Sequence, residues 1–276
     1  MNHKTKIPKT IHYCWFGKNK MPKNILECLD TWEKILPEYK KVCWNEDNFD
    51  IHSNKFVEEA YNAKKWAFVA DYVRLYALYH HGGIYLDTDV KVLKPLDSFL
   101  NHKVFASYEN KLQLNFIATG LIGAIRNHGF FKKWLDYYED KHFILPPGEY
   151  DLTTNVCIIT NIAEKEYSFK GNGKYQVFDD DIHIYPFDFF SCYNGEQDYG
   201  FKNTCEITDN TYAVHLFASS WLPAKVKRRR KIQNIIGYDN YCKIQKFLKI
   251  QKKIRAIIGE DRYYKIKFFL RLKDTR

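Results

Sequence analysis

Apolar positions near the start of the chain follow two different periods. Residues 7–17 are mostly apolar and β-prone and end at a glycine, which predicts a buried strand and its exit loop. In residues 22–36 the apolar side chains recur at helical spacing, with Pro22 placed to begin the helix and Pro37 to end it. Residues 39–44 predict a second strand. Because a strand, a helix and a strand follow one another, we expect a βαβ unit and a parallel sheet.

A second strong helix is predicted over residues 65–80. It is apolar nearly all round, as buried helices are. A pair of glycines follows it, and glycine is a common residue at a helix end. Residues 84–86 then form a short apolar strand that leads directly to Asp87 and Asp89. The strand therefore delivers two acidic side chains at its carboxyl end.

The rest of the body continues the alternation of strands and helices. Further strands are predicted at 90–93, 103–108, 116–124, within 175–190 and at 212–216. Helices are predicted at 129–138 and 152–163, with a loop rich in Pro and Gly at 145–151. This order predicts an α/β fold class.

The sequence changes character after residue 221. A basic run, residues 225–231, is followed by an apolar stripe at helical spacing in residues 241–258, with lysines largely between its members. Residues 223–276 hold 18 Lys and Arg against four Asp and Glu, which leaves 25 basic and 29 acidic residues in the rest. We therefore expect two parts: a mildly acidic catalytic domain, residues 1–222, and a basic amphipathic helical tail, residues 223–276.

Bulk composition excludes several classes of protein. Among the 276 residues, 45% are hydrophobic and 17% aromatic, so the chain can build a core and disorder is not expected. The aromatic excess suits stacking on bases or sugars, or an aromatic-rich core. The seven cysteines form no C-x-x-C pair, which argues against zinc and disulfide frameworks and predicts reduced thiols. No signal peptide or membrane span is visible, so a cytoplasmic protein is expected.

Asp87 and Asp89 are the first candidates for chemistry. In open α/β sheets, ligands bind outside the carboxyl ends of the strands, where these two residues are expected. Carboxylate oxygens with positions left for phosphate and water suit Mn²⁺ or Mg²⁺. A D-x-D triplet alone is also common in solvated turns, so the pair is informative only in its context.

Asp71 and Arg74 supply part of that context. They lie three residues apart on the apolar helix, so they are neighbours on one face. Charged groups on such a helix are costly unless they are paired. One reading is an internal salt bridge that faces water. The other is that both side chains reach a ligand, Arg74 towards a diphosphate or carboxylate and Asp71 towards sugar hydroxyls.

Taken together, the motifs resemble those of a known family. Ala70-Asp71-x-x-Arg74, followed by Gly82-Gly83-x-Tyr85-x-Asp87-x-Asp89, resembles the signature of glycosyltransferase family 32. The opening Ile7-Pro8-Lys9-Thr10-Ile11-His12-x-x-Trp15-x-Gly17 is similar to its first strand, and His215-x-x-x-Ser219-Ser220-Trp221 to its closing motif. That family includes yeast mannosyltransferases and bacterial capsule and lipopolysaccharide transferases, and the glucosyltransferase domains of clostridial toxins share its layout. The basic tail lies outside the resemblance.

The resemblance implies a GT-A type, Rossmann-like nucleotide-sugar-binding fold, a divalent cation (Mn²⁺ or Mg²⁺) and transfer with retention of configuration. Asp71, Arg74, Asp87 and Asp89 would be the catalytic residues. The metal ion would be held by Asp87, Asp89 and His215, with Asp89 coordinating it directly. The donor would be bound by Trp15, Ala70, Asp71, Arg74, Tyr85, Asp87, Ser219, Ser220 and Trp221. In this arrangement Trp15 would stack on the base and Trp221 would close over the diphosphate.

One element of the family pattern is missing. Many members carry Thr-Gly-Pro in the middle of the chain, where this sequence has residues 151–156. Within them Asn155 is expected either to face the donor sugar or to cap a helix. No dedicated general base is evident, and Glu109 and Asp151 are positions at which a separate base would be sought. The resemblance implies front-face transfer, in which the leaving phosphate oxygen accepts the acceptor's proton.

Donor and acceptor are expectations from the resemblance. UDP-galactose, UDP-glucose or an N-acetylated UDP-hexose leads, with GDP-mannose as an alternative. The acceptor is expected to be a saccharide, carried on a lipid diphosphate, in the synthesis of a bacterial capsule or lipopolysaccharide.

The tail, residues 223–276, is expected to dock on an anionic membrane surface, which would make the enzyme peripheral on the inner face of the plasma membrane. Its stripe could instead pack on the catalytic domain or form a dimer. A nucleic-acid- or membrane-binding protein without catalysis is the alternative function. The acidic body and the lack of any nucleic-acid motif argue against nucleic acid as the partner.

Overall fold

A computed structural model describes residues 6–109, 115–192 and 207–217. All of these residues belong to one compact unit. The predicted boundary at residue 222 and the basic tail lie outside the described residues, so both stay predictions. None of the described helices is long and apolar enough to cross a membrane.

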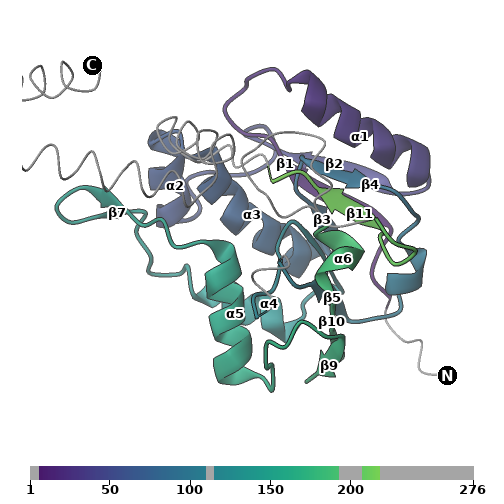
Figure 1. Ribbon diagram of the computed structural model, residues 1–276. Coiled ribbons are helices and arrows are strands. Elements are labelled where there is room, and N and C mark those ends of the chain that lie inside the picture. The colour runs from purple at the N-terminus through teal and green to yellow at the C-terminus, as the bar shows by residue number, and fades with distance from the viewer. Residues whose placement is uncertain (1–5, 110–114, 193–206, 218–276) are drawn as a thin grey trace, which may run out of the picture. The chain divides into compact units, whose positions relative to one another are not determined.

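A seven-stranded mixed sheet forms the centre of this unit (Figure 1). Its strands lie in the order β2 (Lys40–Trp44), β1 (Thr10–Cys14), β3 (Gly83–Leu86), β6 (Leu121–Ala124), β5 (Val104–Ser107), β10 (Ile182–Tyr185) and β9 (Gln176–Phe178). The first three are parallel, β6 runs antiparallel to both β3 and β5, and β10 runs parallel to β5. The predicted α/β fold with its parallel unit is therefore confirmed.

Helices cover both faces of the sheet, because side chains alternate between the faces along each strand. α1 (Lys23–Ile35) buries Trp32 in one core together with Ile84 and Leu86 of β3. Tyr85, between them in the sequence, belongs to the other core. That second core holds residues of α2 (Lys55–Asn62), α3 (Trp66–His81), α4 (Gly129–Asp136) and α5 (Asn155–Glu166). β3 is thus buried on both faces.

A second, two-stranded sheet pairs distant parts of the chain. β4 (Val90–Val92) follows β3 directly, and β11 (Ala213–His215) runs antiparallel to it. The indole Nε1 of Trp32 donates to the carbonyl of Val90 at 2.8 Å, which ties α1 to this small sheet. The pairing places residue 215 beside residue 90.

Some local predictions differ from the structure. α2 was not predicted, although Asn54 caps it by accepting from the amide of Val57 at 3.3 Å. The predicted loop at 145–151 contains a hairpin, β7 (Ile144–Leu145) and β8 (Glu149–Tyr150). Glu59 of α2 holds the base of that hairpin by accepting from the amides of residues 143 and 144 at 2.9 and 3.0 Å. A tertiary contact of this kind leaves no local sequence signal.

Two further differences concern residues 187–192. Part of the segment expected to hold short strands forms the helix α6 (Phe187–Phe190). Cys192 is disulfide-bonded, so the prediction of reduced thiols is wrong there, whereas four other cysteines in the described part are not disulfide-bonded.

His12 fastens the junction that leads into β3. Its Nε2 lies 2.8 Å from the carbonyl of Gly82, and its Nδ1 accepts from the indole of Trp44 at 3.1 Å. Since Nδ1 accepts, the proton sits on Nε2 and the ring is neutral. Gly83 has φ +117°, and a Cβ there would lie 2.6 Å from the carbonyl of Thr10, so glycine is required for this approach. The Gly82-Gly83 pair therefore sets where β3 begins.

We expect His12 to make the protein sensitive to acid. Burial lowers the pKa of His12 from 6.5 to about 4. Between these two pH values the unfolded chain binds a proton at His12 and the folded chain does not. The contribution of neutral His12 to the free energy of unfolding is therefore fully present above about pH 6.5 and is lost as the pH falls towards 4. The free energy of unfolding falls by about 3 kcal/mol over this range. Urea unfolding should show the stability gap between wild type and His12→Gln narrowing between pH 7 and 4. A constant gap would contradict this, and His52→Gln, at an exposed site, is the control.

Candidate active site

Asp87 and Asp89 lie where β3 ends and the chain turns into β4. The amide of Asp87 donates to the carbonyl of Gly120 at 2.7 Å, and the amide of Val90 donates back to the carbonyl of Asp87 at 3.0 Å. These bonds fix a tight turn at the carboxyl end of a buried parallel strand. Both carboxylates therefore stand at the edge where open α/β sheets bind ligands, as predicted.

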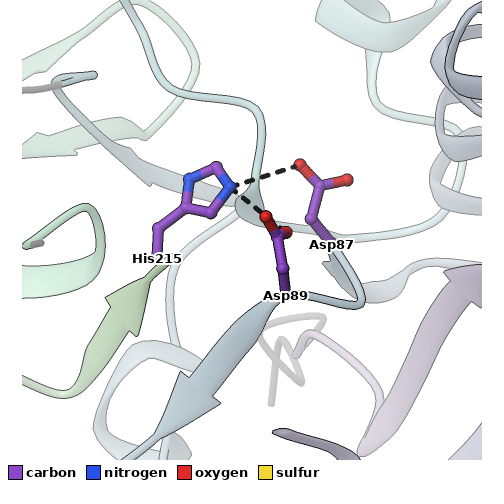
Figure 2. Close-up of side chains that lie close together, drawn as sticks. All are labelled: Asp87, Asp89 and His215. Carbon is purple, nitrogen blue, oxygen red and sulfur yellow. Dashed lines mark ion pairs between the residues drawn. The ribbon is translucent and has the colours of Figure 1, made fainter. Parts of the chain in front are cut away.

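His215 joins the two aspartates from the far end of the described chain. The β4–β11 pairing sets it opposite Val90, and the amide of Leu216 donates to the carbonyl of Asp89 at 3.0 Å. The Nε2 atom of His215 lies 3.3 Å from Oδ1 of Asp89 and 4.0 Å from Oδ2 of Asp87 (Figure 2). One ligand atom from each residue falls within 4.8 Å of the others. The predicted metal-binding set is thus brought together.

The chemistry of these donors fits a divalent cation. Two carboxylates and an imidazole suit Mn²⁺, and both acidic residues leave oxygens for further contacts. Burial alone would lower the pKa of His215, but Asp89 and Asp87 more than offset it and raise the pKa to about 9. At neutral pH the His215 imidazole is therefore protonated, and its positive charge lies next to the position that a metal ion would occupy. Binding of a cation then requires His215 to release a proton.

Gly120 gives this centre its floor. A Cβ at Gly120 would lie 2.9 Å from Cε1 of His215 and 3.2 Å from Oδ2 of Asp87. The glycine belongs to a bulge between β5 and β6. Phe105 pairs with Gly123, and Tyr108 pairs with Ile117. An advance of three residues on the β5 side is therefore matched by six residues on the partner side, which leaves extra residues out of the pairing. Bulges of this kind redirect backbone beside active sites.

Arg74 occupies the middle of the acidic cluster. Its Nη2 lies 3.0 Å from Oδ1 of Asp71 and 3.2 Å from Oδ1 of Asp87, and its Nη1 donates to the carbonyl of Thr119 at 2.6 Å. The guanidinium packs over the ring of Tyr85, with 4.5 Å between its Cζ and the ring centroid. Only 6% of the side chain is exposed. The predicted internal salt bridge between Asp71 and Arg74 is therefore present, but it is largely buried instead of facing water, and it also reaches Asp87.

Asp71 is held from behind by Asn155. The side-chain amide of Asn155 donates to the carbonyl of Asp71 at 3.0 Å and accepts from the hydroxyl of Tyr138 at 2.9 Å. Asn155 is not the helix cap, since Thr154 takes that position in α5. Burial raises the pKa of the Asp71 carboxyl to about 7, against the opposing effect of Arg74.

The remaining predicted donor-binding residues are placed with less detail. Trp15 follows β1 at the same sheet edge, and its indole donates to the carbonyl of Asn19 at 2.6 Å. Tyr85 is fully buried beneath Arg74, and Ala70 lies half-buried on α3. Their contacts to a donor stay predictions. Ser219, Ser220 and Trp221 lie outside the described residues.

Sequence reasoning missed Thr119 and Gly120 as parts of the site. Thr119 contributes only a backbone carbonyl, and Gly120 contributes only the absence of a side chain. Neither leaves a motif. Glu109 was named only as a position at which to test for a base, and the charges that act on its carboxyl are those of His215, Asp87, Arg74 and Asp89.

Comparison with known proteins identifies fungal and viral relatives. The chain is 25% identical over 169 residues to inositol phosphoceramide mannosyltransferase 2 of Schizosaccharomyces pombe, covering 58% of this chain and 47% of the relative. It is 28% identical over 224 residues to the uncharacterized glycosyltransferase L373 of Acanthamoeba polyphaga mimivirus, covering 79% and 84%. A solved structure, the PaToxG glycosyltransferase, is 18% identical with a TM-score of 0.44. The match covers 58% of this chain and 70% of that one.

The names of these relatives do not confirm the expected bacterial pathway, so the donor, the acceptor and the pathway stay predictions. Two of the fungal relatives are named as inositol phosphoceramide mannosyltransferases and a third as a mannosyl phosphorylinositol ceramide synthase, and none of the three as a bacterial capsule or lipopolysaccharide enzyme. The chain spans about half or less of the length of those relatives.

We expect a methyl group at position 120 to disrupt the centre without unfolding the protein. In Gly120→Ala the new Cβ would push His215 and Asp87 apart, and Mn²⁺ affinity should fall by about 10- to 100-fold. Gly129→Ala is the matched control, because a Cβ there meets nothing within 4 Å. Calorimetric Mn²⁺ titration measures both. Equal affinities in the two variants would show that the floor does not shape the site.

Residues 22–106 match the family model of the glycosyltransferase sugar-binding region containing the DXD motif. That range holds both aspartates of the turn together with Asp71, Arg74 and Tyr85. The mixed sheet, with the motif at the carboxyl end of a parallel strand, fits the GT-A type fold that the resemblance implied. Residues 22–106 are therefore similar to the sugar-binding region of the DXD-containing glycosyltransferases, in agreement with the resemblance of the motifs.

Proposed function

We propose that the chain is a metal-dependent glycosyltransferase that moves a hexose from a nucleotide-sugar donor to a hydroxyl of its acceptor, with retention of configuration. The observation that carries this proposal is the convergence of Asp87, Asp89 and His215 within the family's DXD region. A bound Mn²⁺ or Mg²⁺ would neutralise charge on the leaving diphosphate. The three side chains would hold the ion.

The other charged residues of the site position this set. Arg74 binds Asp87 through Oδ1 and leaves Oδ2 on the side of His215. It is committed to two carboxylates and a carbonyl, so we assign it to orienting Asp87 and to giving positive charge beneath the diphosphate. Asp71, beside it, would accept a hydrogen bond from a donor hydroxyl.

Transfer to the same face of the sugar needs no separate base in this proposal. As the bond between the anomeric carbon and the phosphate oxygen breaks, that oxygen gains negative charge. It can then accept the proton that the acceptor hydroxyl loses as it attacks the anomeric carbon. The site residues hold donor and acceptor in register for this exchange.

The names of the relatives move the proposed donor towards mannose. Three fungal relatives are named for transfer of mannose to inositol phosphoceramide. We therefore place GDP-mannose beside the UDP-hexoses, and propose an acceptor hydroxyl on the head group of a phosphorylated membrane lipid. A lipid acceptor would give the basic tail a purpose, namely to hold the enzyme as a peripheral protein on an anionic membrane surface.

A donor screen tests the central proposal. With Mn²⁺ present, one of GDP-mannose, UDP-glucose, UDP-galactose, UDP-GlcNAc and UDP-GalNAc should release its nucleotide slowly, with water as acceptor. Release should stop with EDTA and fall by at least about 100-fold in Asp89→Ala, because the diphosphate then loses its counter-charge. If no donor reacts and neither GDP nor UDP binds with Mn²⁺, the proposal is wrong.

A vesicle assay tests the role of the tail. Each basic residue near an anionic surface contributes about 1 kcal/mol of attraction, so the full chain should sediment with phosphatidylserine vesicles. A chain that ends at Leu222 should stay in solution, and salt should release the full chain. Equal sedimentation of the two chains would contradict the proposed docking.

A further inference from the structure

Glu109 stands at the same sheet edge as the metal-binding aspartates. It follows Tyr108 beyond the carboxyl end of β5, and its amide donates to the carbonyl of Phe116 at 2.9 Å. β3 and β5 both run antiparallel to β6, which lies between them, so their carboxyl ends share one edge. Two interstrand spacings separate Asp87 from Glu109 at the level of the strands, roughly 10 Å.

The bulge places Gly120 on the segment that runs between β5 and β3. The chain leaves β5 after Ala118, whose amide donates to the carbonyl of Ser107 at 2.8 Å, and crosses towards β3, where the carbonyl of Gly120 accepts from the amide of Asp87. Gly120 itself brings no side chain there, and a Cβ at this position would lie 2.9 Å from Cε1 of His215. The segment between β5 and β3 therefore lies directly against the metal-binding side chains.

The Glu109 carboxyl has no partner of its own among the described residues. It makes no side-chain hydrogen bond or ion pair there, in contrast to Asp71, Asp87 and Asp89. Burial raises the pKa of Glu109 to about 7, and the charges that act on it besides are those of His215, Asp87, Arg74 and Asp89. A partly buried carboxyl that faces a site and lacks a partner is suited to accept hydrogen bonds from a ligand.

We propose that Glu109 binds hydroxyl groups of the sugar attached to the metal-bound diphosphate. This inference rests on the proposed function and adds a specificity residue to it. With a diphosphate on Asp87, Asp89 and His215, the sugar would lie one bond beyond the phosphate. Glu109 would approach it from the side of β5, and Asp71 and Arg74 from the side of α3. Glu109 is not one of the three metal ligands.

The test compares each nucleotide with its sugar-bearing form. Binding of Mn²⁺, of GDP and UDP, and of GDP-mannose, UDP-glucose and UDP-galactose is measured by calorimetry for wild type, Glu109→Gln and Glu109→Ala. We expect Mn²⁺ and the bare nucleotides to bind all three proteins within about twofold. The nucleotide sugar that wild type prefers should bind Glu109→Ala about 10- to 100-fold more weakly, as loss of hydrogen bonds to a charged group predicts. Glu109→Gln, which keeps one acceptor oxygen, should fall between them.

The outcomes separate this inference from the function on which it rests. Unchanged affinity for every nucleotide sugar in Glu109→Ala would overturn the role of Glu109 and leave the function standing. A parallel loss of Mn²⁺ and bare-nucleotide binding would also overturn it, since Glu109 would then act through the metal centre. A wild-type chain that binds no nucleotide with Mn²⁺ would contradict the function itself. Glu139→Gln, an exposed carboxylate outside the site, is the matched control.

Discussion

Repulsion between carboxylates is the constraint around which this site is built. Asp71, Asp87 and Asp89 lie close together at one end of the sheet. Their low exposure to solvent strengthens the electrostatic interactions between them. Arg74 forms ion pairs with Asp71 and Asp87. The ring of Tyr85 and the carbonyl of Thr119 hold the guanidinium in position. Removing one partner of such a buried pair costs about 3–5 kcal/mol, because the other charge is left without compensation. The bulge, the buried ring of Tyr85 and the apolar helix α3 all position the guanidinium of Arg74.

His215 balances the third carboxylate and shows how the fold couples stability to ligand binding. In the absence of a metal the imidazole is a cation beside Asp89, so the acidic turn is partly neutralised before any ligand arrives. A divalent ion replaces one positive charge by two and displaces a proton. The same three side chains would therefore serve two charge states of the site.

The periodicity of apolar residues predicted the helices and strands that position the site. It did not predict the contacts within the site that have no periodic pattern in the sequence. The helices at 23–35 and 66–81 and the strand before Asp87 were evident because their apolar spacing is strong. The closeness of His215 to Asp89 followed only from the resemblance, since 126 positions separate them in the sequence. Gly120 acts by lacking a side chain, and the pairing slip beside it depends on three strands at once.

The β4–β11 pairing has a consequence for how the protein is made. β11 is the last strand of the described chain, and it pairs with a strand more than a hundred residues earlier. During synthesis the acidic turn emerges from the ribosome long before residue 215 can reach it. A nascent or truncated chain that lacks β11 has the turn and Arg74 but no imidazole. Competence to bind a metal ion through all three side chains therefore arrives only when the final strand is added.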